Sequence, residues 1–220
     1  MRIVLDNGTP AEVARPAGGE PTQGLVLCPD IMGLRPLFDT MAERLAEEHG
    51  WVVVAPEPFA GHEDLDLAAR MAWVGNFDDL KVLNTLQQAA DATGMHQVGI
   101  LGFCMGGMWA LKASMTGRFH RAVSFYGMIR MPEQWRSATQ ADALDYVTAP
   151  GACPVLELVG TEDPFVPMVD VADLQAADAA VVIYEGAEHG FVHDETRPSH
   201  RPEDAADAWA RAVTFLHEDF

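Results

Sequence analysis

The stretch VGILGFCMGGMWALKA, residues 98–113, joins an apolar segment, a cysteine between glycines and a second apolar segment. Residues 98–101 have the character of a short buried strand, and residues 108–113 have that of a helix. Cys104 lies at the centre of the turn between them, with Gly102 and Gly106 two positions to either side. Such glycines allow the close backbone approach of a nucleophile elbow, a sharp strand-to-helix turn that presents its central side chain. The pattern therefore predicts Cys104 as a thiol nucleophile, in the position that serine usually takes.

Other short apolar runs predict further strands of the same sheet. They lie at residues 25–28, 51–55, 122–126, 155–159 and 181–184. Helical patterns occur between most of them, at about 37–49, 78–93 and 202–217. Alternating strands and helices predict an α/β fold, with a mostly parallel central sheet covered by helices on both faces. Asn7-Gly8, between two apolar segments, predicts a hairpin and hence an antiparallel edge at the N-terminus.

Length and charge limit the classes of protein to consider. The chain has 220 residues and 49% hydrophobic content, which fits one buried core, so we expect a single domain over residues 1–220. Its formal net charge of −19 disfavours nucleic acid as a partner, because phosphate binding requires a basic surface. The acidic residues are interpreted as a solvated surface. Two less regular stretches, 130–151 and 193–202, are expected at the rim of the site.

The composition also predicts a cytoplasmic protein. The first residues reach Asp6 after three apolar side chains, too few for the core of a signal peptide. No apolar run approaches the ~20 residues that a membrane-spanning helix needs, so no membrane association is expected. Three cysteines, an odd number, fit a reducing compartment better than a disulfide framework. Cys28 and Cys153 lie in or beside predicted strands and are expected to be buried hydrophobic residues.

A thiol nucleophile needs a base, and the base needs an acid that holds its tautomer. The predicted strand 155–159 is followed by Gly160-Thr161-Glu162-Asp163-Pro164, and the strand 181–184 by a loop containing His189. Nucleophile, acid and histidine then occur in the chain order of α/β hydrolases. We predict His189 as the base and Asp163 as the acid, with the adjacent Glu162 as the competing candidate. A turn-forming role before Pro164 is the alternative for Asp163.

Two backbone donors are expected to stabilise a developing oxyanion. The elbow offers the amide of Met105, and the loop after strand 25–28 nominates the amide of Ile31. A metal site at His189, His193 and His200 is disfavoured because their spacing does not align ligands, and no metal or cofactor is predicted. The large aromatic residues Trp73, Trp109 and Trp209 are interpreted as core or pocket walls.

These residues together resemble the dienelactone hydrolase family. The elbow cysteine, the Gly-Thr-Glu-Asp turn and the His-Gly-Phe loop at 189–191 carry the resemblance, which runs from about residue 20 to the C-terminus. The segment Pro56-Glu57-Pro58-Phe59 and the final helix also match. The resemblance implies an α/β-hydrolase fold, a Cys-His-Asp triad, and cofactor-independent hydrolysis of a small-molecule lactone or ester through an acyl-thioenzyme.

Three positions depart from the family pattern. Asp30 stands where the best-known members carry a glutamate that holds the resting thiol until substrate displaces it. His193 stands where these members carry a substrate-binding arginine, and Gly190 stands where some members carry a serine. A second substrate-binding arginine of the family lies in a helical region that corresponds to the one around Arg70. A broad carboxylesterase is therefore an alternative within enzymes. A thiol redox sensor or binding module on the same fold is an alternative of another class.

Asp30 follows a predicted strand and Pro29, which places it at the mouth of the sheet near the elbow. A carboxylate beside Cys104 disfavours a second negative charge there, so we predict that Asp30 gates the reactivity of the thiol. The alternative is an aspartate that caps its own loop by accepting backbone hydrogen bonds.

Overall fold

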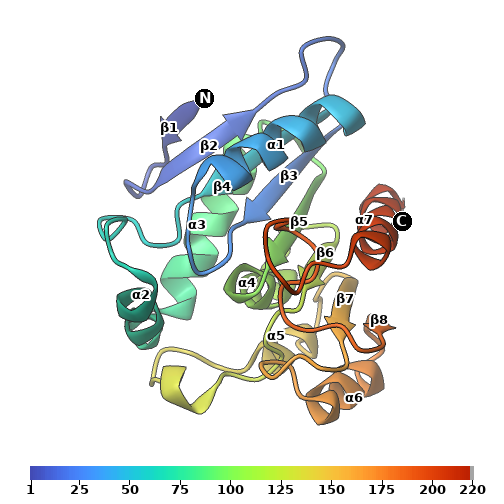
Figure 1. The fold of residues 1–220 in the computed structure, drawn as a ribbon. Helices are drawn as coiled ribbons and strands as arrows, with labels where there is room; N and C mark the ends of the chain where they lie inside the picture. The colour runs from blue at the N-terminus through green and yellow to red at the C-terminus, as the bar shows by residue number, and fades with distance from the viewer. Residues whose placement is uncertain (219–220) are drawn as a thin grey trace.

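A computed structural model describes residues 1–218 and contains one eight-stranded sheet (Figure 1). The strand order is β1-β2-β4-β3-β5-β6-β7-β8. The strands are β1 (Arg2–Val4), β2 (Pro10–Ala14), β3 (Gln23–Cys28), β4 (Trp51–Pro56), β5 (Val98–Phe103), β6 (Ala122–Phe125), β7 (Val155–Gly160) and β8 (Ala180–Tyr184). Strands β3 to β8 pair in parallel, whereas β1 with β2 and β2 with β4 pair antiparallel. This confirms the mostly parallel sheet and its antiparallel N-terminal edge.

The boundaries of the three long amphipathic helices were predicted closely. α1 spans Pro36–His49, α3 spans Asp79–Ala92 and α7 spans Pro202–His217, each within one residue of its prediction. The elbow helix α4 begins earlier than predicted, at Met105, and ends at Ala113. The short helices α2 (Leu67–Trp73), α5 (Ala143–Val147) and α6 (Met168–Ala176) were not assigned from periodicity. Three 3₁₀ turns complete the described elements: η1 (Val74–Asn76), η2 (Ser114–Thr116) and η3 (Glu133–Trp135).

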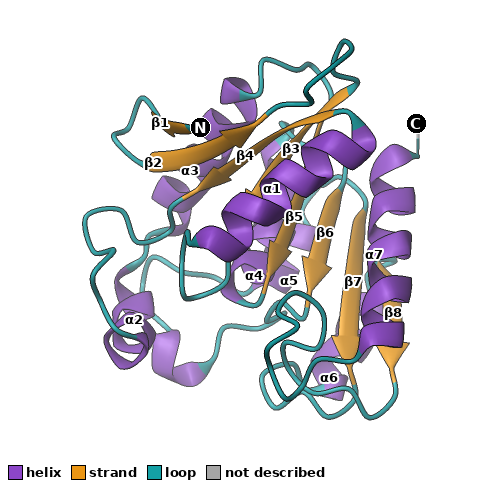
Figure 2. Cartoon of the chain, turned by 45° about the horizontal axis from the view of Figure 1, so that its top comes forward, coloured by secondary structure: helices purple, strands orange, loops and turns teal. Residues whose placement is uncertain are grey.

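Helices cover both faces of the sheet, as Figure 2 shows for α1 and α7 on one side and α3 and α4 on the other. Alternate residues of β3 divide between the two sides: Leu25 and Leu27 pack in the cluster of α1 and α7, and Val26 and Cys28 in that of α3 and α4. Because β3 is buried on both faces, its residues form the near-continuous apolar run that predicted it.

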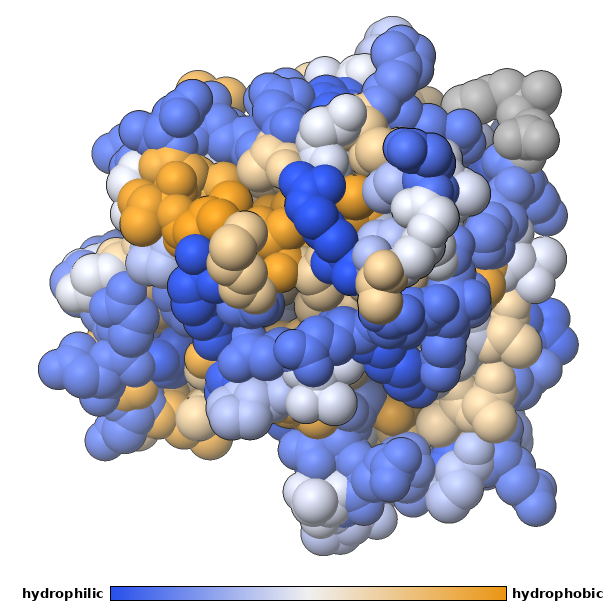
Figure 3. All heavy atoms as spheres, turned by 90° about the horizontal axis from the view of Figure 1, so that it is seen from above, coloured by the Kyte–Doolittle hydropathy of each residue, from blue (hydrophilic) through white to orange (hydrophobic). Residues whose placement is uncertain are grey.

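One face of the molecule is mainly polar. Most of this face is hydrophilic, and its largest group of hydrophobic residues is the orange area of Figure 3. Within residues 1–218, no helix is both long and apolar enough to cross a membrane.

The cysteines differ in burial. All three are free thiols. Cys28 is buried, as predicted. The prediction for Cys153 was wrong, because this residue is only half-buried in the loop that precedes β7. The apolar run that suggested a buried cysteine starts as a strand only at Val155, and Cys153 packs against the edge of the core from the loop before it.

Glycines set how closely β5, α4 and β3 approach one another. A Cβ atom added at Gly102 would lie 2.1 Å from the carbonyl oxygen of Gly106. A Cβ atom at Gly106 would lie 2.3 Å from the carbonyl oxygens of both Cys28 and Pro29. These neighbours are backbone atoms of packed elements and cannot move independently. The elbow therefore requires glycine at both positions for steric reasons.

We expect Gly106→Ala to lower the free energy of unfolding by about 3 kcal/mol, because its methyl group overlaps backbone that has no room to shift. Gly75→Ala is the matched control, since its added Cβ would meet its nearest neighbour, Trp135 O, at an ordinary 3.8 Å. The control should stay within about 1 kcal/mol of the parent in urea unfolding. Equal unfolding midpoints for the two variants would contradict the packing argument.

Candidate active site

Cys104 has a left-handed backbone conformation, with φ 56° and ψ −120°, where β5 ends and α4 begins. Side chains rarely adopt this region, and the strain costs on the order of 1–3 kcal/mol. Two backbone hydrogen bonds fix the turn: Cys104 N donates to Phe125 O, and Cys104 O accepts from Met108 N, both at 3.0 Å. The neighbouring strand and the first turn of α4 thus hold the cysteine in the geometry of an elbow.

Asp163 and His189 meet at the ends of two adjacent strands. Asp163 follows β7 and His189 follows β8, and their Oδ2 and Nδ1 atoms lie 2.7 Å apart. The other carboxylate oxygen of Asp163 accepts from Phe165 N at 2.8 Å, which fixes the turn. The imidazole ring contacts Phe165 and Tyr126 edge-on. Burial and ring packing leave His189 a single orientation toward the carboxylate.

The competing carboxylate, Glu162, points to solvent. It is exposed, and its backbone N donates to Ala187 O at 3.0 Å. No hydrogen bond links its side chain to His189 among the described residues. Of the two adjacent acids, the one in contact with the histidine is Asp163.

The surroundings of His189 raise its pKa. Burial alone would lower its pKa, but the negative charge of Cys104 and the hydrogen bond with Asp163 outweigh burial and raise the pKa to about 10. Its second nitrogen, Nε2, is buried and completes no hydrogen bond within residues 1–218. Loose alignment of a nucleophile with its base is common before substrate binds. The electrostatic coupling nevertheless pairs His189 with Cys104.

The two backbone amides nominated as oxyanion donors are both available. Neither Ile31 N nor Met105 N donates a hydrogen bond to another described residue. Met105 is the first residue of α4, so its N–H has no acceptor within the helix. Ile31, Met105 and Cys104 pack in one apolar cluster. The positive end of α4 thus lies beside the sulfur.

Asp30 is buried, and the side chains of two arginines and one histidine surround its carboxylate. Arg35 binds both of its oxygens, at 2.7 and 2.9 Å, and His193 Nε2 lies 2.9 Å from Oδ2. Arg197 adds a contact at 3.3 Å, and Met32 N donates to Oδ1 at 2.9 Å. None of the hydrogen bonds of Asp30 with described residues goes to Cys104. The contact with Met32 is of the kind that the loop-capping alternative requires.

The pKa values of Asp30 and His193 are both lowered from their usual values. Burial would raise the pKa of Asp30, but hydrogen bonds from His193 and Arg35 hold it well below its usual range. Burial lowers the pKa of His193, so this ring is neutral. A neutral ring that donates from Nε2 to Asp30 accepts at Nδ1, where the Tyr126 hydroxyl donates at 2.6 Å. Tyr126, His193 and Asp30 therefore form a chain of hydrogen bonds beside the catalytic candidates.

Comparison with known proteins identifies the family. Residues 9–220 match the model of the dienelactone hydrolase family. A Bradyrhizobium protein named "Probable 2-oxo-3-(5-oxofuran-2-ylidene)propanoate lactonase" is 29% identical, over 96% of this chain and 92% of its own. A Methylorubrum extorquens protein named "Putative carboxymethylenebutenolidase" is 30% identical, over 99% of this chain and 80% of its own. The chain belongs to the dienelactone hydrolase family.

A solved structure agrees with this assignment. The Klebsiella pneumoniae crystal structure named "Putative Dienelactone Hydrolase" has a TM-score of 0.88 and 25% identity, and covers 100% of this chain and 98% of that one. The α/β-hydrolase fold implied by the sequence resemblance is thereby confirmed. Membership of this family makes the chain a member of a hydrolase family.

Arg70, one of the positions marked by the resemblance, is buried and already paired. It stacks on Phe59, with the guanidinium carbon 4.6 Å from the ring centre, and lies 3.8 Å from Glu57. Its Nε atom donates to Leu65 O at 2.8 Å. Arg70 therefore supports the loop between β4 and α2.

Sequence reasoning missed several residues near the candidate site. Tyr126, Arg35 and Arg197 were not nominated, and His193 was noted as a replacement for arginine and in a disfavoured metal site. Glu157 was missed as well: it is fully buried in β7, burial raises its pKa well above the usual range, and it accepts from Gly127 N at 3.1 Å. A glutamate inside the apolar run 155–159 was a signal for a buried polar contact. No spacing rule connects Asp30 with Arg197.

Asp163→Asn should lower kcat by about 10⁴-fold, because the amide no longer fixes the tautomer of His189. The imidazolium form loses a negative partner, so the pKa of His189 falls. The alkaline decline of kcat/KM, expected near pH 10 in the parent, should move to lower pH. Glu162→Gln is the control, and it should keep both rate and profile. A larger loss in Glu162→Gln would assign the acid to Glu162.

Asp30→Asn should reduce the free energy of unfolding at pH 7 by about 2 kcal/mol, because half-buried Arg35 loses its charged hydrogen-bond partner. The pKa of Asp30 is lowered in the folded protein, so its contribution is present at neutral pH and disappears as pH falls below about 4. The stability difference between the two proteins should shrink over that range in urea titrations. A difference independent of pH would contradict the ionised network.

The same variant separates the two interpretations of Asp30. Gating predicts that iodoacetamide labels Cys104 faster in Asp30→Asn than in the parent at neutral pH, while ester hydrolysis slows. Loop capping predicts lower stability with an unchanged pH dependence of labelling. Labelling rates measured against pH for both proteins decide between them.

Proposed function

We propose that the protein hydrolyses a small lactone or carboxylic ester, with Cys104 as nucleophile, His189 as proton carrier and Asp163 as the residue that orients His189. The observation that carries the proposal is the 2.7 Å contact between Asp163 and His189, at strand ends next to the strained Cys104 turn. The names of the lactonase and the carboxymethylenebutenolidase among its relatives support the same reaction class.

In the first half of the reaction, the Cys104 thiolate attacks the carbonyl carbon and forms a C–S bond. The carbonyl oxygen becomes an oxyanion, to which Ile31 N and Met105 N donate. Collapse of this intermediate breaks the C–O bond of the ester. The imidazolium of His189 gives its Nε2 proton to the departing alkoxide, which leaves as an alcohol, or stays attached when the substrate is a lactone.

In the second half, water attacks the thioester and His189 takes one of its protons. The same two amides stabilise the second oxyanion. Breaking the C–S bond then releases the carboxylic acid and returns the thiolate next to the imidazolium. The raised pKa of His189, about 10, suits this cycle because the ring is charged before each turnover. Neither half requires a metal or an organic cofactor.

The other cysteines are poor nucleophiles. Burial raises the pKa of Cys153 to about 12 and that of Cys28 further still. Both are therefore thiols at neutral pH, and thiols attack carbonyl groups far more slowly than thiolates. Cys28 and Cys153 are therefore weaker candidates for the reactive sulfur than Cys104, which lies in the elbow.

Cys104→Ala should lower kcat for phenyl acetate by at least about 10⁴-fold, because removing one member of a triad disables the unit. The urea unfolding midpoint should stay close to that of the parent. Iodoacetamide should inactivate the parent with one label per chain, located on Cys104 by peptide mass analysis.

Cys28→Ser and Cys153→Ser serve as controls for labelling. Each should still be inactivated with a single label on Cys104. Retained hydrolysis in Cys104→Ala would reject the nucleophile, and so would loss of activity that follows labelling of Cys28 or Cys153.

A further inference from the structure

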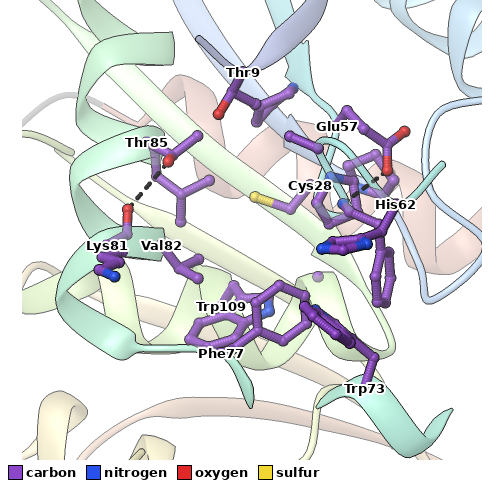
Figure 4. A pocket seen from close by; sticks show the side chains of 17 residues that line it. Thr9, Cys28, Glu57, His62, Trp73, Phe77, Lys81, Val82, Thr85 and Trp109 are labelled. Carbon is purple, nitrogen blue, oxygen red and sulfur yellow. Dashed lines mark hydrogen bonds between the residues drawn. The ribbon is translucent and has the colours of Figure 1, made fainter. Parts of the chain in front are cut away.

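A cavity of about 420 Å³ lies on the α3 and α4 side of the sheet, next to the elbow. Phe59, Trp73, Phe77 and Trp109 are among the residues that line it (Figure 4). Phe77 contacts both Phe59 and Trp109, with ring centres 5.2 and 5.8 Å apart, and His62 lies against Trp73 at 4.0 Å. Figure 4 shows Trp73, Phe77 and Trp109 along one side. The volume is in the range of pockets that bind small molecules.

Two residues of the cavity wall are close in the chain to the proposed oxyanion donors. Pro29 and Gly106 line the cavity, and these residues lie next to Asp30 and Met105 in the chain. The wall residues Phe59 and Trp109 belong to the same apolar cluster as Ile31, Met105 and Cys104. The cavity wall and the proposed oxyanion donors are therefore neighbouring parts of one packed cluster.

Charged groups around the cavity are already neutralised or lie at its rim. The Glu57 carboxylate accepts from Phe59 N and Leu34 N, both at 2.8 Å, and pairs with buried Arg70. Among the described residues that line the cavity, the remaining charged side chain is that of Lys81, which is exposed. The chain as a whole carries a formal charge of −19. A field of this sign repels anionic substrates and leaves uncharged ones unaffected.

We propose that this cavity binds an uncharged aromatic ring of the ester or lactone, which makes the enzyme selective for neutral aryl substrates. This inference rests on the proposed hydrolase function and adds the substrate class. Tilted and edge-on ring contacts favour an aromatic guest over an alkyl chain of similar area.

Filling the cavity should remove this selectivity. Val82 lines the cavity from α3 and is half-buried, so Val82→Trp places a large ring in the empty volume. Asn84→Trp adds the same ring at an exposed position of the same helix, outside the cavity, and is the matched control. Three neutral substrates probe the site: vinyl acetate has no ring, phenyl acetate has one on the alcohol side, and vinyl benzoate has one on the acyl side.

We expect Val82→Trp to lower kcat/KM for phenyl acetate or vinyl benzoate at least about tenfold more than for vinyl acetate, through KM, because ring burial is lost. Asn84→Trp should not change the ratio. The parent should also hydrolyse phenyl acetate about tenfold faster than 4-acetoxybenzoate at low ionic strength, and added salt should narrow the gap. Equal losses on all three neutral substrates, or a preference for the carboxylated ring, would overturn the proposal.

A binding measurement separates this proposal from the reaction itself. Acetophenone, an uncharged ring with one hydrogen-bond acceptor, should quench tryptophan fluorescence saturably in Cys104→Ala and not in the Cys104→Ala, Val82→Trp double variant. Binding without hydrolysis of any ester would overturn the proposed function and retain the ring site. Cys104-dependent hydrolysis without saturable binding would retain the function and overturn the ring site.

Discussion

The left-handed backbone of Cys104 is the constraint on which the rest of the site depends. At φ 56° and ψ −120° the turn is strained, so close packing from several sides has to maintain it. Gly102 and Gly106 allow β3 and β5 to meet α4 at distances that no methyl group permits. Tyr126, at the end of the next strand, also has a positive φ of 44°. Glu157 fixes that second turn through Gly127 N. Strained backbone therefore occurs at the ends of two neighbouring strands, at Cys104 and at Tyr126.

Two histidine–aspartate pairs lie close together, and the pKa values of their histidines shift in opposite directions. His189 pairs with Asp163 and also feels the negative charge of Cys104, so its pKa rises despite burial. His193 shares Asp30 with two arginines, and burial then lowers its pKa. The same two residue types therefore give a charged ring that can transfer a proton and a neutral ring that orders its surroundings. What decides between them is the balance of charges around each carboxylate.

Sequence patterns predicted the parts of the site that depend on local structure. The elbow follows from glycine spacing, and Asp163 and His189 follow from their places after predicted strands, since ends of parallel strands meet at one edge of a sheet. The Asp30 network was not predictable this way. His193 and Arg197 lie 163 and 167 residues from Asp30, and neither belongs to a recognisable spacing. The short helices α2 and α6 have too few turns to show a helical periodicity in the sequence. The apolar run after Cys153 suggested a buried residue, whereas Cys153 is half-buried.

Glu57 connects the two parts of the molecule that a substrate would contact. Its carboxylate accepts from Leu34 N, in the loop that follows Ile31, and from Phe59 N, in the aromatic wall of the cavity. Arg70 of α2 neutralises it and stacks on Phe59. Gly33 is required beneath this pair, because a Cβ atom there would lie 2.6 Å from Glu57 Oε1. A buried charge is costly unless it is paired and hydrogen-bonded, and here both conditions are met by residues of the cavity wall and the oxyanion loop. Burial of Glu57 therefore ties the position of the aromatic wall to that of the proposed oxyanion donor.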